Sequence, residues 1–261
     1  MFENYNCPIP SVDTYLERIG APAPTAGPSL EYLDELIRLH QSSVPFENLD
    51  IYDYHRPIRL EIPALYEKIV LRRRGGYCFE LNGLFLQLLK ALGYDAWPCV
   101  CRGLLRGEEG PILHRAVLVR LADTIYLCDV GFGGPSSSCA LPLQENSPRI
   151  ALGKTFYVKK ARDTWWTTVQ RTPEGEDQEV LRFSTAVMEP VDFIPLSYYC
   201  STEETSYFRS QRMASLRTPE GSISISDMTF KETRGTDIRE TVLESRSELE
   251  SVLRNRFGML L

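Results

Sequence analysis

The hydrophobic period of this chain of 261 residues changes from helical to strand-like close to position 94. Before that point, apolar residues recur every three or four positions, as on the buried side of a helix. Beyond it, short runs of β-branched and aromatic residues alternate with turns at even spacing, which is typical of a small sheet or barrel. Helices first and strands later indicate an α+β architecture.

The first region is expected to form a helical bundle. Ser11 would cap the first helix and Gly20 would end it, with proline and glycine filling 21–28. The apolar stripes that predict helices lie at 12–19, 30–37, 63–73 and 81–92.

The remainder is expected to be rich in strands. The β-type runs lie at 97–102, 116–120, 125–130, 155–160, 165–170, 180–184 and 222–226. A last helix is expected at 247–256. Its capping box would be formed by Ser245 with Glu248 or by Ser247 with Glu250.

A cysteine stands at the expected start of one helix, in the run RGGYCFELN at 74–82. Gly75 and Gly76 let the backbone turn tightly, which places Cys78 in or beside the first helical turn. Unpaired N–H groups and the helix dipole favour an anion there, and the arginines at 72–74 add positive charge upstream. Cys78 is therefore the leading nucleophile, against the alternative of a buried, inert thiol.

The chain has three histidines that could activate this thiol. His40 lies at the end of an expected helix and His55 in a polar loop, whereas His114 directly precedes an expected strand. In a hairpin turning at 121–123, facing residue numbers sum to about 243, so His114 and Asp129 can lie side by side. A carboxylate on one imidazole nitrogen would support proton transfer at the other. A simple surface pair is the alternative reading.

Four segments of the chain, taken in order, resemble the arylamine N-acetyltransferases. This family moves an acetyl group from acetyl-coenzyme A to aromatic amines and hydrazines. The matching segments are VPFENL at 44–49, RGGYCFELN at 74–82, His114, and DVGFGG at 129–134. The likeness covers roughly 13–143 well and fades afterwards.

The resemblance implies a role for particular residues. Cys78, His114 and Asp129 would form the catalytic triad. The implied substrate-binding residues are Phe132 as a wall of the acceptor pocket, with Phe46, Gly131 and Gly133 beside it. Glu47 and Arg74 would brace the site. An acyl-coenzyme A would serve as co-substrate, with no permanently bound cofactor.

The resemblance also implies a division of the chain. Segment 1–93 would be the helical bundle that carries the cysteine, 94–195 a β-barrel that carries the histidine and aspartate, and 196–261 an α/β lid. The active site would then lie in the cleft between the first two.

Two positions depart from the family pattern. The family often has an asparagine before an aromatic pair, and here Ser197 stands before Tyr198 and Tyr199. Pro135, directly after the glycine pair, stiffens a loop expected to face the acyl donor. Both departures bear on donor and acceptor preference.

The expected reaction is a two-step acyl relay through an acyl-cysteine. An amide synthase that joins a carrier-bound or coenzyme A-bound acyl chain to an aryl amine is the first alternative. A cysteine hydrolase of the papain or transglutaminase type shares the same triad logic. A binding module with a vestigial triad is the remaining reading. The acyl group, the amine and the oligomeric state stay open.

Composition excludes several other classes. Hydrophobic residues make up 43% and charged residues 25%, and the formal net charge is -6. Without a concentrated basic face, nucleic acid is not an expected partner. No segment reaches the ~20 apolar residues that span a bilayer, so a membrane is not expected either.

Cysteine usage bears on location and metal binding. The chain has seven cysteines, without secreted-scaffold spacing, and no signal peptide is readable, so reduced thiols in the cytoplasm are expected. Cys99 and Cys101 suggest a metal site, but we expect them on opposite faces of a strand. No second Cys or His pair has ligand spacing, so no metal is predicted.

Overall fold

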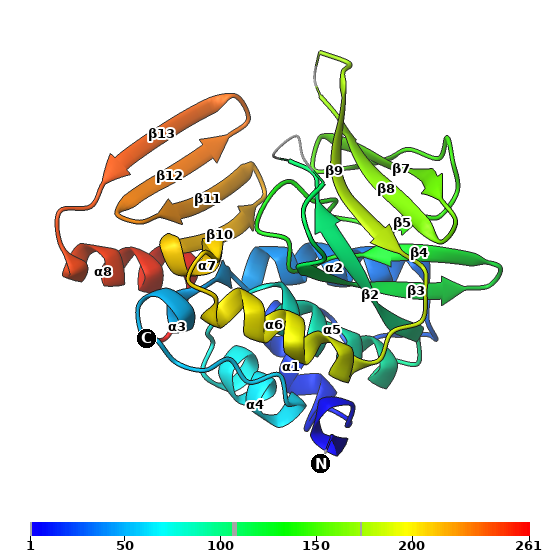
Figure 1. Cartoon of the computed structure of the whole chain (residues 1–261), viewed down its shortest axis with the longest axis horizontal. Helices are drawn as coiled ribbons and strands as arrows, with labels where there is room; N and C mark the ends of the chain where they lie inside the picture. Colours follow the sequence, from blue (N-terminus) through cyan, green and yellow to red (C-terminus); the bar gives the residue numbers. More distant parts are fainter. Residues whose placement is uncertain (1, 106–108, 173) are drawn as a thin grey trace.

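The computed structural model describes residues 2–105, 109–172 and 174–261 and combines helices with two sheets (Figure 1), which confirms the α+β class. The helices are η1 (Glu3–Tyr5), α1 (Val12–Ile19), α2 (Leu30–Ser43), α3 (Leu49–Tyr52), α4 (Ile62–Tyr66), η2 (Glu67–Leu71), α5 (Cys78–Ala91), η3 (Pro190–Asp192), α6 (Phe193–Thr202), α7 (Tyr207–Ser210) and α8 (Arg246–Phe257). The strands are β1 (Phe46–Glu47), β2 (Asp95–Gly103), β3 (His114–Leu121), β4 (Thr124–Cys128), β5 (Leu141–Pro142), β6 (Arg149–Ala151), β7 (Lys154–Arg162), β8 (Trp165–Arg171), β9 (Asp177–Ser184), β10 (Met213–Thr218), β11 (Gly221–Ser226), β12 (Thr229–Arg234) and β13 (Asp237–Val242).

Capping residues set the ends of the first and last α-helices. The Ser11 hydroxyl accepts a hydrogen bond from the Thr14 amide at 3.2 Å, and Gly20 ends α1 with a φ of 71°. At α8 the Ser245 hydroxyl accepts from the Glu248 amide, so Ser245 rather than Ser247 is the cap. Within the ranges that the structure describes, no helix has both the length and the apolar character needed to cross a membrane.

The helix expected at 63–73 has a different form. It begins as α4 and continues as η2, a π-helical turn that ends at Leu71. A π-helical turn widens the helix and rotates the side chains that follow it. Lys68 is directed inward onto two carboxylates, whereas Arg72 pairs with Glu67 at the surface.

The sequence patterns do not predict α6 and α7. Apolar and aromatic side chains are spread around α6, so no helical stripe stands out there. Phe193, Ser197 and Cys200 are its buried residues. In Figure 1, α6 passes in front of α5, the helix that Cys78 begins.

The larger sheet forms the predicted barrel. Its eight antiparallel strands follow the order β5-β4-β3-β2-β9-β8-β7-β6, and contacts between β5 and β7 nearly close it. The interior is filled by Leu118, Phe156, Val158, Leu181 and Phe183, among other buried side chains.

The hairpin of β3 and β4 has a different register from the expected one. Val117 faces Cys128 and Leu121 faces Thr124, which is a shift of two positions. Because side chains alternate between the faces of a strand, a shift of two leaves every residue on its expected face. His114 and Asp129 therefore still share a face, as diagonal rather than direct neighbours.

The smaller sheet has the order β1-β10-β11-β12-β13. Leu249, Leu253 and Phe257 of α8 pack against one face of it, where Ile225 and Phe230 lie. Its first strand, β1, comes from the N-terminal segment and lies between β10 and the loop before α5, since the Glu47 amide donates to the Gly76 carbonyl at 2.9 Å. We retain the division into 1–93, 94–195 and 196–261 as a proposal.

We predict that Gly75→Ala destabilises the fold. An added Cβ would collide with the carbonyl oxygen of Pro45 and lie 2.8 Å from the Glu47 Cγ. The backbone beside β1 must then shift, and the free energy of unfolding should fall by about 2 to 3 kcal/mol in urea denaturation. Gly27→Ala is the matched control, because a Cβ there meets no atom within 4 Å. Equal unfolding midpoints for the two variants would contradict the prediction.

Candidate active site

Cys78 occupies the first position of α5, as the glycine turn predicts. The Glu80 carboxylate accepts a hydrogen bond from the Tyr77 amide at 3.1 Å and so closes the first helical turn. The thiol lies 3.9 Å from the carbonyl oxygen of Leu113, the residue directly before β3. Only 2% of Cys78 is exposed, so the thiol is enclosed between the bundle and the barrel.

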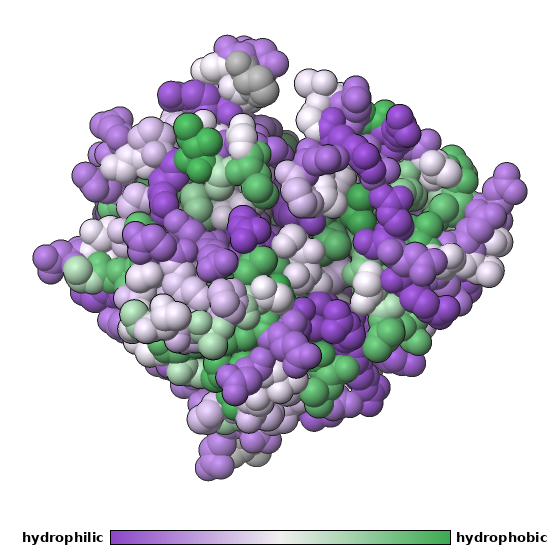
Figure 2. All heavy atoms as spheres, turned by 180° about the vertical axis from the view of Figure 1, so that it is seen from behind, coloured by the Kyte–Doolittle hydropathy of each residue, from purple (hydrophilic) through white to green (hydrophobic). Residues whose placement is uncertain are grey.

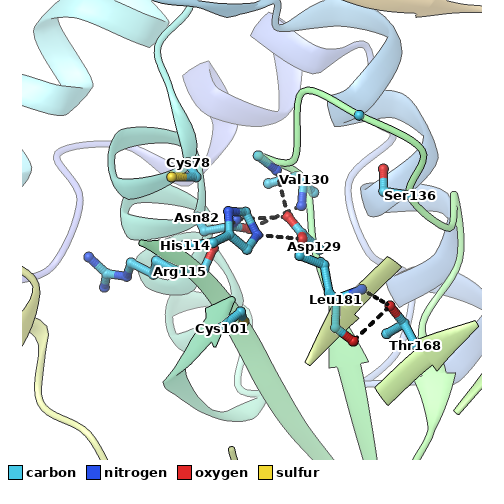
Figure 3. A network of polar contacts seen from close by, with 12 residues as sticks. Cys78, Asn82, Cys101, His114, Arg115, Asp129, Val130, Ser136, Thr168 and Leu181 are labelled. Carbon is cyan, nitrogen blue, oxygen red and sulfur yellow. Dashed lines mark hydrogen bonds and ion pairs between the residues drawn. The ribbon is translucent and has the colours of Figure 1, made fainter. Parts of the chain in front are cut away.

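His114 and Asp129 meet beside this thiol, as Figure 3 shows. His114 Nε2 lies 2.7 Å from Asp129 Oδ2, and both residues are buried. With Nε2 engaged by the carboxylate, Nδ1 is the nitrogen left for proton exchange. The Phe132 ring meets the imidazole edge-on, with 5.2 Å between ring centroids.

Asn82 joins the helix to the barrel at this point. Its Nδ2 donates to the Arg115 carbonyl at 2.6 Å and to Asp129 Oδ1 at 2.9 Å, while its Oδ1 accepts from the Val130 amide at 3.0 Å. Figure 3 shows Asn82 between Cys78 and Asp129. We did not assign it a role from sequence, although it stands one helical turn after Cys78 in the same motif.

Burial opposes the thiolate that the helix start favours. Desolvation raises the pKa of Cys78 well above its ordinary value, and Cys200 and Asp129 raise it further. The backbone amides of Arg115 and Phe79 act in the opposite direction. The neutral thiol therefore needs a base to accept its proton before it can attack.

A buried ion network lies behind the first turn of α5. Arg74 bonds the Glu47 carboxylate at 2.8 and 3.1 Å and lies 3.4 Å from Asp50. Lys68 reaches Asp50 at 2.7 Å and Glu80 at 2.8 Å. Sequence reasoning named Glu47 and Arg74 but missed Asp50 on α3 and Lys68 in the π-helical turn η2.

The neighbouring carboxylates determine the direction in which the pKa of Lys68 shifts. Although burial alone would lower its pKa, the carboxylates of Glu80, Glu47 and Asp50 raise it above the ordinary value. Lys68 is therefore a permanent cation that holds the carboxylate closing the first turn of α5.

Two positions of the 129–134 segment, Gly131 and Gly133, lie so close to neighbouring residues that a side chain would not fit. A Cβ at Gly131 would lie 2.9 Å from the Cys78 Cα and 2.8 Å from Asn82 Nδ2. One at Gly133 would lie 2.7 Å from the Phe46 ring. The segment can pack against the start of α5 only because these side chains are missing.

A pocket of about 390 Å³ opens beyond Phe132, between the barrel loop at 131–136 and one face of the smaller sheet. Phe46, Val130, Gly133 and the predicted departure Pro135 also line it. Seen from behind, the outline of the molecule is notched between the barrel and the smaller sheet, with hydrophilic residues on both sides of the notch (Figure 2).

The sheet face of this pocket is polar and cationic. Arg217 and Lys231 line it together with the hydroxyls of Ser215, Ser222, Ser224 and Thr233, and Lys154 at the start of β7 adds a third cation from the barrel. Among its described lining residues there is no aspartate or glutamate. Arg217 donates to the Gly134 carbonyl at 3.1 Å and so also anchors the barrel loop.

The structure places Ser197 away from this pocket. The Tyr77 hydroxyl bonds the Ser197 hydroxyl and, at 3.2 Å, its carbonyl oxygen. Ser197 is 3% exposed. Its position in the fold links α6 to the residue that precedes Cys78.

Our expectation for Cys99 and Cys101 is wrong in geometry. Residues two apart on a strand share a face, and the two sulfur atoms lie 4.0 Å apart in the barrel interior. In the described part of the chain, no three His, Cys, Asp or Glu side chains are grouped as metal ligands would be.

Comparisons with known proteins place most of the chain beside one family. Residues 29–261 match the model of a family described as N-acetyltransferase. The arylamine N-acetyltransferase / N-hydroxyarylamine O-acetyltransferase of Salmonella typhimurium is 29% identical over 240 residues, covering 90% of this chain and 84% of that protein. The solved Salmonella typhimurium enzyme superposes with a TM-score of 0.89 at 27% identity, covering 95% and 90% of the two chains. The Mycobacterium marinum enzyme in complex with CoA gives 0.88 at 28% identity, covering 96% and 93%.

We predict that Lys68→Met strongly destabilises the protein. The change leaves the Asp50 and Glu80 carboxylates buried without their shared cation, which typically costs about 3 to 5 kcal/mol. Thermal unfolding followed by calorimetry measures the loss. Arg72→Met is the control, because its pair with Glu67 is 69% and 49% exposed and should contribute little. Equal melting temperatures for the two variants would argue against the network.

Proposed function

Since the chain belongs to the N-acetyltransferase family, whose relatives are arylamine N-acetyltransferases, we propose that it transfers an acetyl group from acetyl-coenzyme A to the nitrogen of an arylamine or arylhydrazine. The observation that carries the proposal is the arrangement of Cys78 at the start of α5 beside the buried His114–Asp129 pair at 2.7 Å. Cys78 is the proposed nucleophile, His114 the base and Asp129 the residue that orients the imidazole.

In the first step, His114 Nδ1 accepts the proton of the Cys78 thiol. The thiolate attacks the thioester carbonyl, a tetrahedral intermediate forms, and coenzyme A leaves as a thiol after receiving that proton. Asp129 stabilises the imidazolium formed in between. The Cys78 amide has no partner within the helix at this first position, and we assign it the oxyanion of the intermediate.

In the second step, the amine attacks the acyl-cysteine. Its nitrogen forms the new bond to the acyl carbon, His114 takes the proton that the nitrogen loses, and the bond to Cys78 breaks. A thioester is reactive enough for weakly basic aromatic amines, provided that water does not compete. The low exposure of Cys78, 2%, supports such exclusion and disfavours the hydrolase alternative.

The cationic pocket is the proposed site for the acyl donor. Burial lowers the pKa of Arg217, and burial together with the neighbouring Arg217 lowers the pKa of Lys154. Two neighbouring cations in a pocket without acidic lining residues, one of which is disfavoured by the charge of the other, form an anion site. The phosphates of coenzyme A supply the anion. Lys231 also lines the pocket, but its charge is already paired with Glu240 at 3.2 Å.

The amide-synthase reading remains the second candidate. The pocket of about 390 Å³ would take the phosphates of the donor in either reading, so its size does not separate the two. A longer acyl chain carried by the same donor would use the same triad and the same cations.

We predict that acetyl-coenzyme A acetylates Cys78 once. Intact-protein mass spectrometry should show one acetyl adduct that peptide mapping places on Cys78 and that an aryl amine or hydrazine removes. Cys78→Ala is the control and should remain unmodified. If acetyl-, propionyl- and malonyl-coenzyme A all leave the wild type unmodified, this result would contradict simple acetylation and favour the amide-synthase reading.

We predict that Lys154→Gln weakens binding of the acyl donor and leaves the rate of acyl transfer nearly unchanged. Loss of one charge-assisted contact to phosphate should raise KM for acetyl-coenzyme A by about tenfold with little change in kcat. The acetyl thioester of N-acetylcysteamine, which has no phosphate, should react equally with both proteins. Lys159→Gln is the matched control, since Lys159 pairs with Glu179 on the outside of the barrel. An unchanged KM would remove Lys154 from the donor site.

A further inference from the structure

Arg115 is a buried cation without an acidic partner. It is 2% exposed, and its Nε and Nη2 atoms have no hydrogen-bond partner. Among the described residues, none of the ion pairs involves it. A buried charge without compensation costs several kcal/mol, so an isolated guanidinium in a folded enzyme calls for a counter-charge.

The side chain of Arg115 leaves the face of β3 opposite to the His114 imidazole, because consecutive residues of a strand point to opposite faces. On that face Val100, the β2 partner of Arg115, packs in one buried cluster with Cys78 and Phe193. The Arg115 backbone amide acts on the Cys78 sulfur. The side-chain Nη1 packs so closely on Gly83 of α5 that a Cβ there would lie 2.9 Å away, and the Arg115 Cζ lies 4.6 Å from the Phe193 ring centroid. Figure 3 shows the guanidinium and the Cys78 sulfur extending to the same side of His114.

Burial lowers the pKa of Arg115 to about 10, and a negative charge on Cys78 or, to a lesser extent, on Cys99 raises it again. The helix α5 thus separates two kinds of cation. Lys68 and Arg74 behind it are each bonded to carboxylates, whereas Arg115 is not.

The other titratable groups around Cys78 do not favour its anion. Asp129 after β4 raises the pKa of the thiol, and so does Cys200 on α6. Cys101 on β2 and Tyr77 before α5 are neutral groups whose own pKa values are raised by burial. His114 becomes a cation only after it has taken the thiol proton.

We propose that Arg115 is a positioning residue that stabilises the thiolate of Cys78 by its buried positive charge. The proposal rests on the proposed function, because it concerns the same nucleophile. The proton moves from Sγ to His114 Nδ1, and the charge left on sulfur lies between the imidazolium and the guanidinium. The same charge favours Cys78 as the leaving group when the amine attacks, since a thiol of lower pKa leaves faster.

Arg115→Met tests this assignment, because methionine is flexible, apolar and long enough to occupy the space of the stem. The readout is the pH dependence of Cys78 alkylation by iodoacetamide, with the site identified by peptide mapping. The thiol pKa should rise by about one unit or more, and alkylation at neutral pH should slow about tenfold. Arg115→Lys should return the profile most of the way to that of the wild type.

Stability separates this role from a structural one. Removing an unpaired buried charge should leave the melting temperature of Arg115→Met unchanged or higher. A lower melting temperature with an unchanged alkylation profile would overturn the proposal and make Arg115 a packing residue.

Gly83→Ala provides a second perturbation if Arg115→Met does not fold. Alanine suits a helix, and its Cβ should displace the guanidinium without removing its charge, so the thiol pKa should rise by a smaller amount. No rise in either variant overturns the proposal. If the wild type forms the acetyl adduct on Cys78 and these profiles do not change, only the role of Arg115 fails. If no acyl-coenzyme A modifies wild-type Cys78, the proposed function itself fails.

Discussion

The contact of Asn82 with the barrel is the interaction on which the site depends. One amide side chain on α5 holds the Arg115 carbonyl, the Asp129 carboxylate and the Val130 amide. The proposed nucleophile and its proposed base come from different parts of the fold, and neither part alone fixes their separation. Since Asn82 lies one turn after Cys78 on the same rigid helix, a bond to Asp129 is also a bond between the two halves of the site. Every buried polar atom in this contact is satisfied, which is the condition under which such a network specifies one geometry.

Charge is arranged differently on the two sides of α5. Behind the helix, Lys68 and Arg74 are matched by carboxylates, so that network is saturated and serves stability. On the side of the thiol, Asp129 is committed to His114, and Arg115 has no carboxylate partner among the described residues. An unsaturated charge is costly in a resting protein, and it is useful where a charge of the opposite sign appears for part of a reaction cycle. The fold therefore separates charges that hold the helix from charges that respond to chemistry.

Much of this could be predicted from the sequence because the signals are local. Periodicity, Ser11 and Gly20 gave α1, and the glycine turn gave the start of α5. The pairing of His114 with Asp129 was expected even though the hairpin register was wrong by two, because an even shift preserves the face. The environments of Lys68 and Arg115 were not predicted, because they depend on tertiary structure. Nothing in the sequence distinguishes Lys68 from Arg72 without knowledge of the π-helical turn. Arg115 resembles any strand arginine until α5 and Phe193 enclose it. The sulfurs of Cys99 and Cys101 share a face by simple alternation, so that error lay in the reasoning.

The two-residue strand β1 connects distant parts of the chain. Glu47 of β1 bonds Arg74, at the start of the loop before Cys78, and β1 pairs with β10. The side chain of Asn48, which follows β1, donates to two carbonyls, those of Phe208 and Gln211, and accepts from the Met213 amide. During synthesis on the ribosome, the segment around Cys78 emerges long before β10 does. The loop that precedes Cys78, the proposed nucleophile, therefore lacks its outer support until β10, in the last third of the chain, has been made. The chemistry is encoded early in the sequence, and its geometry is completed late.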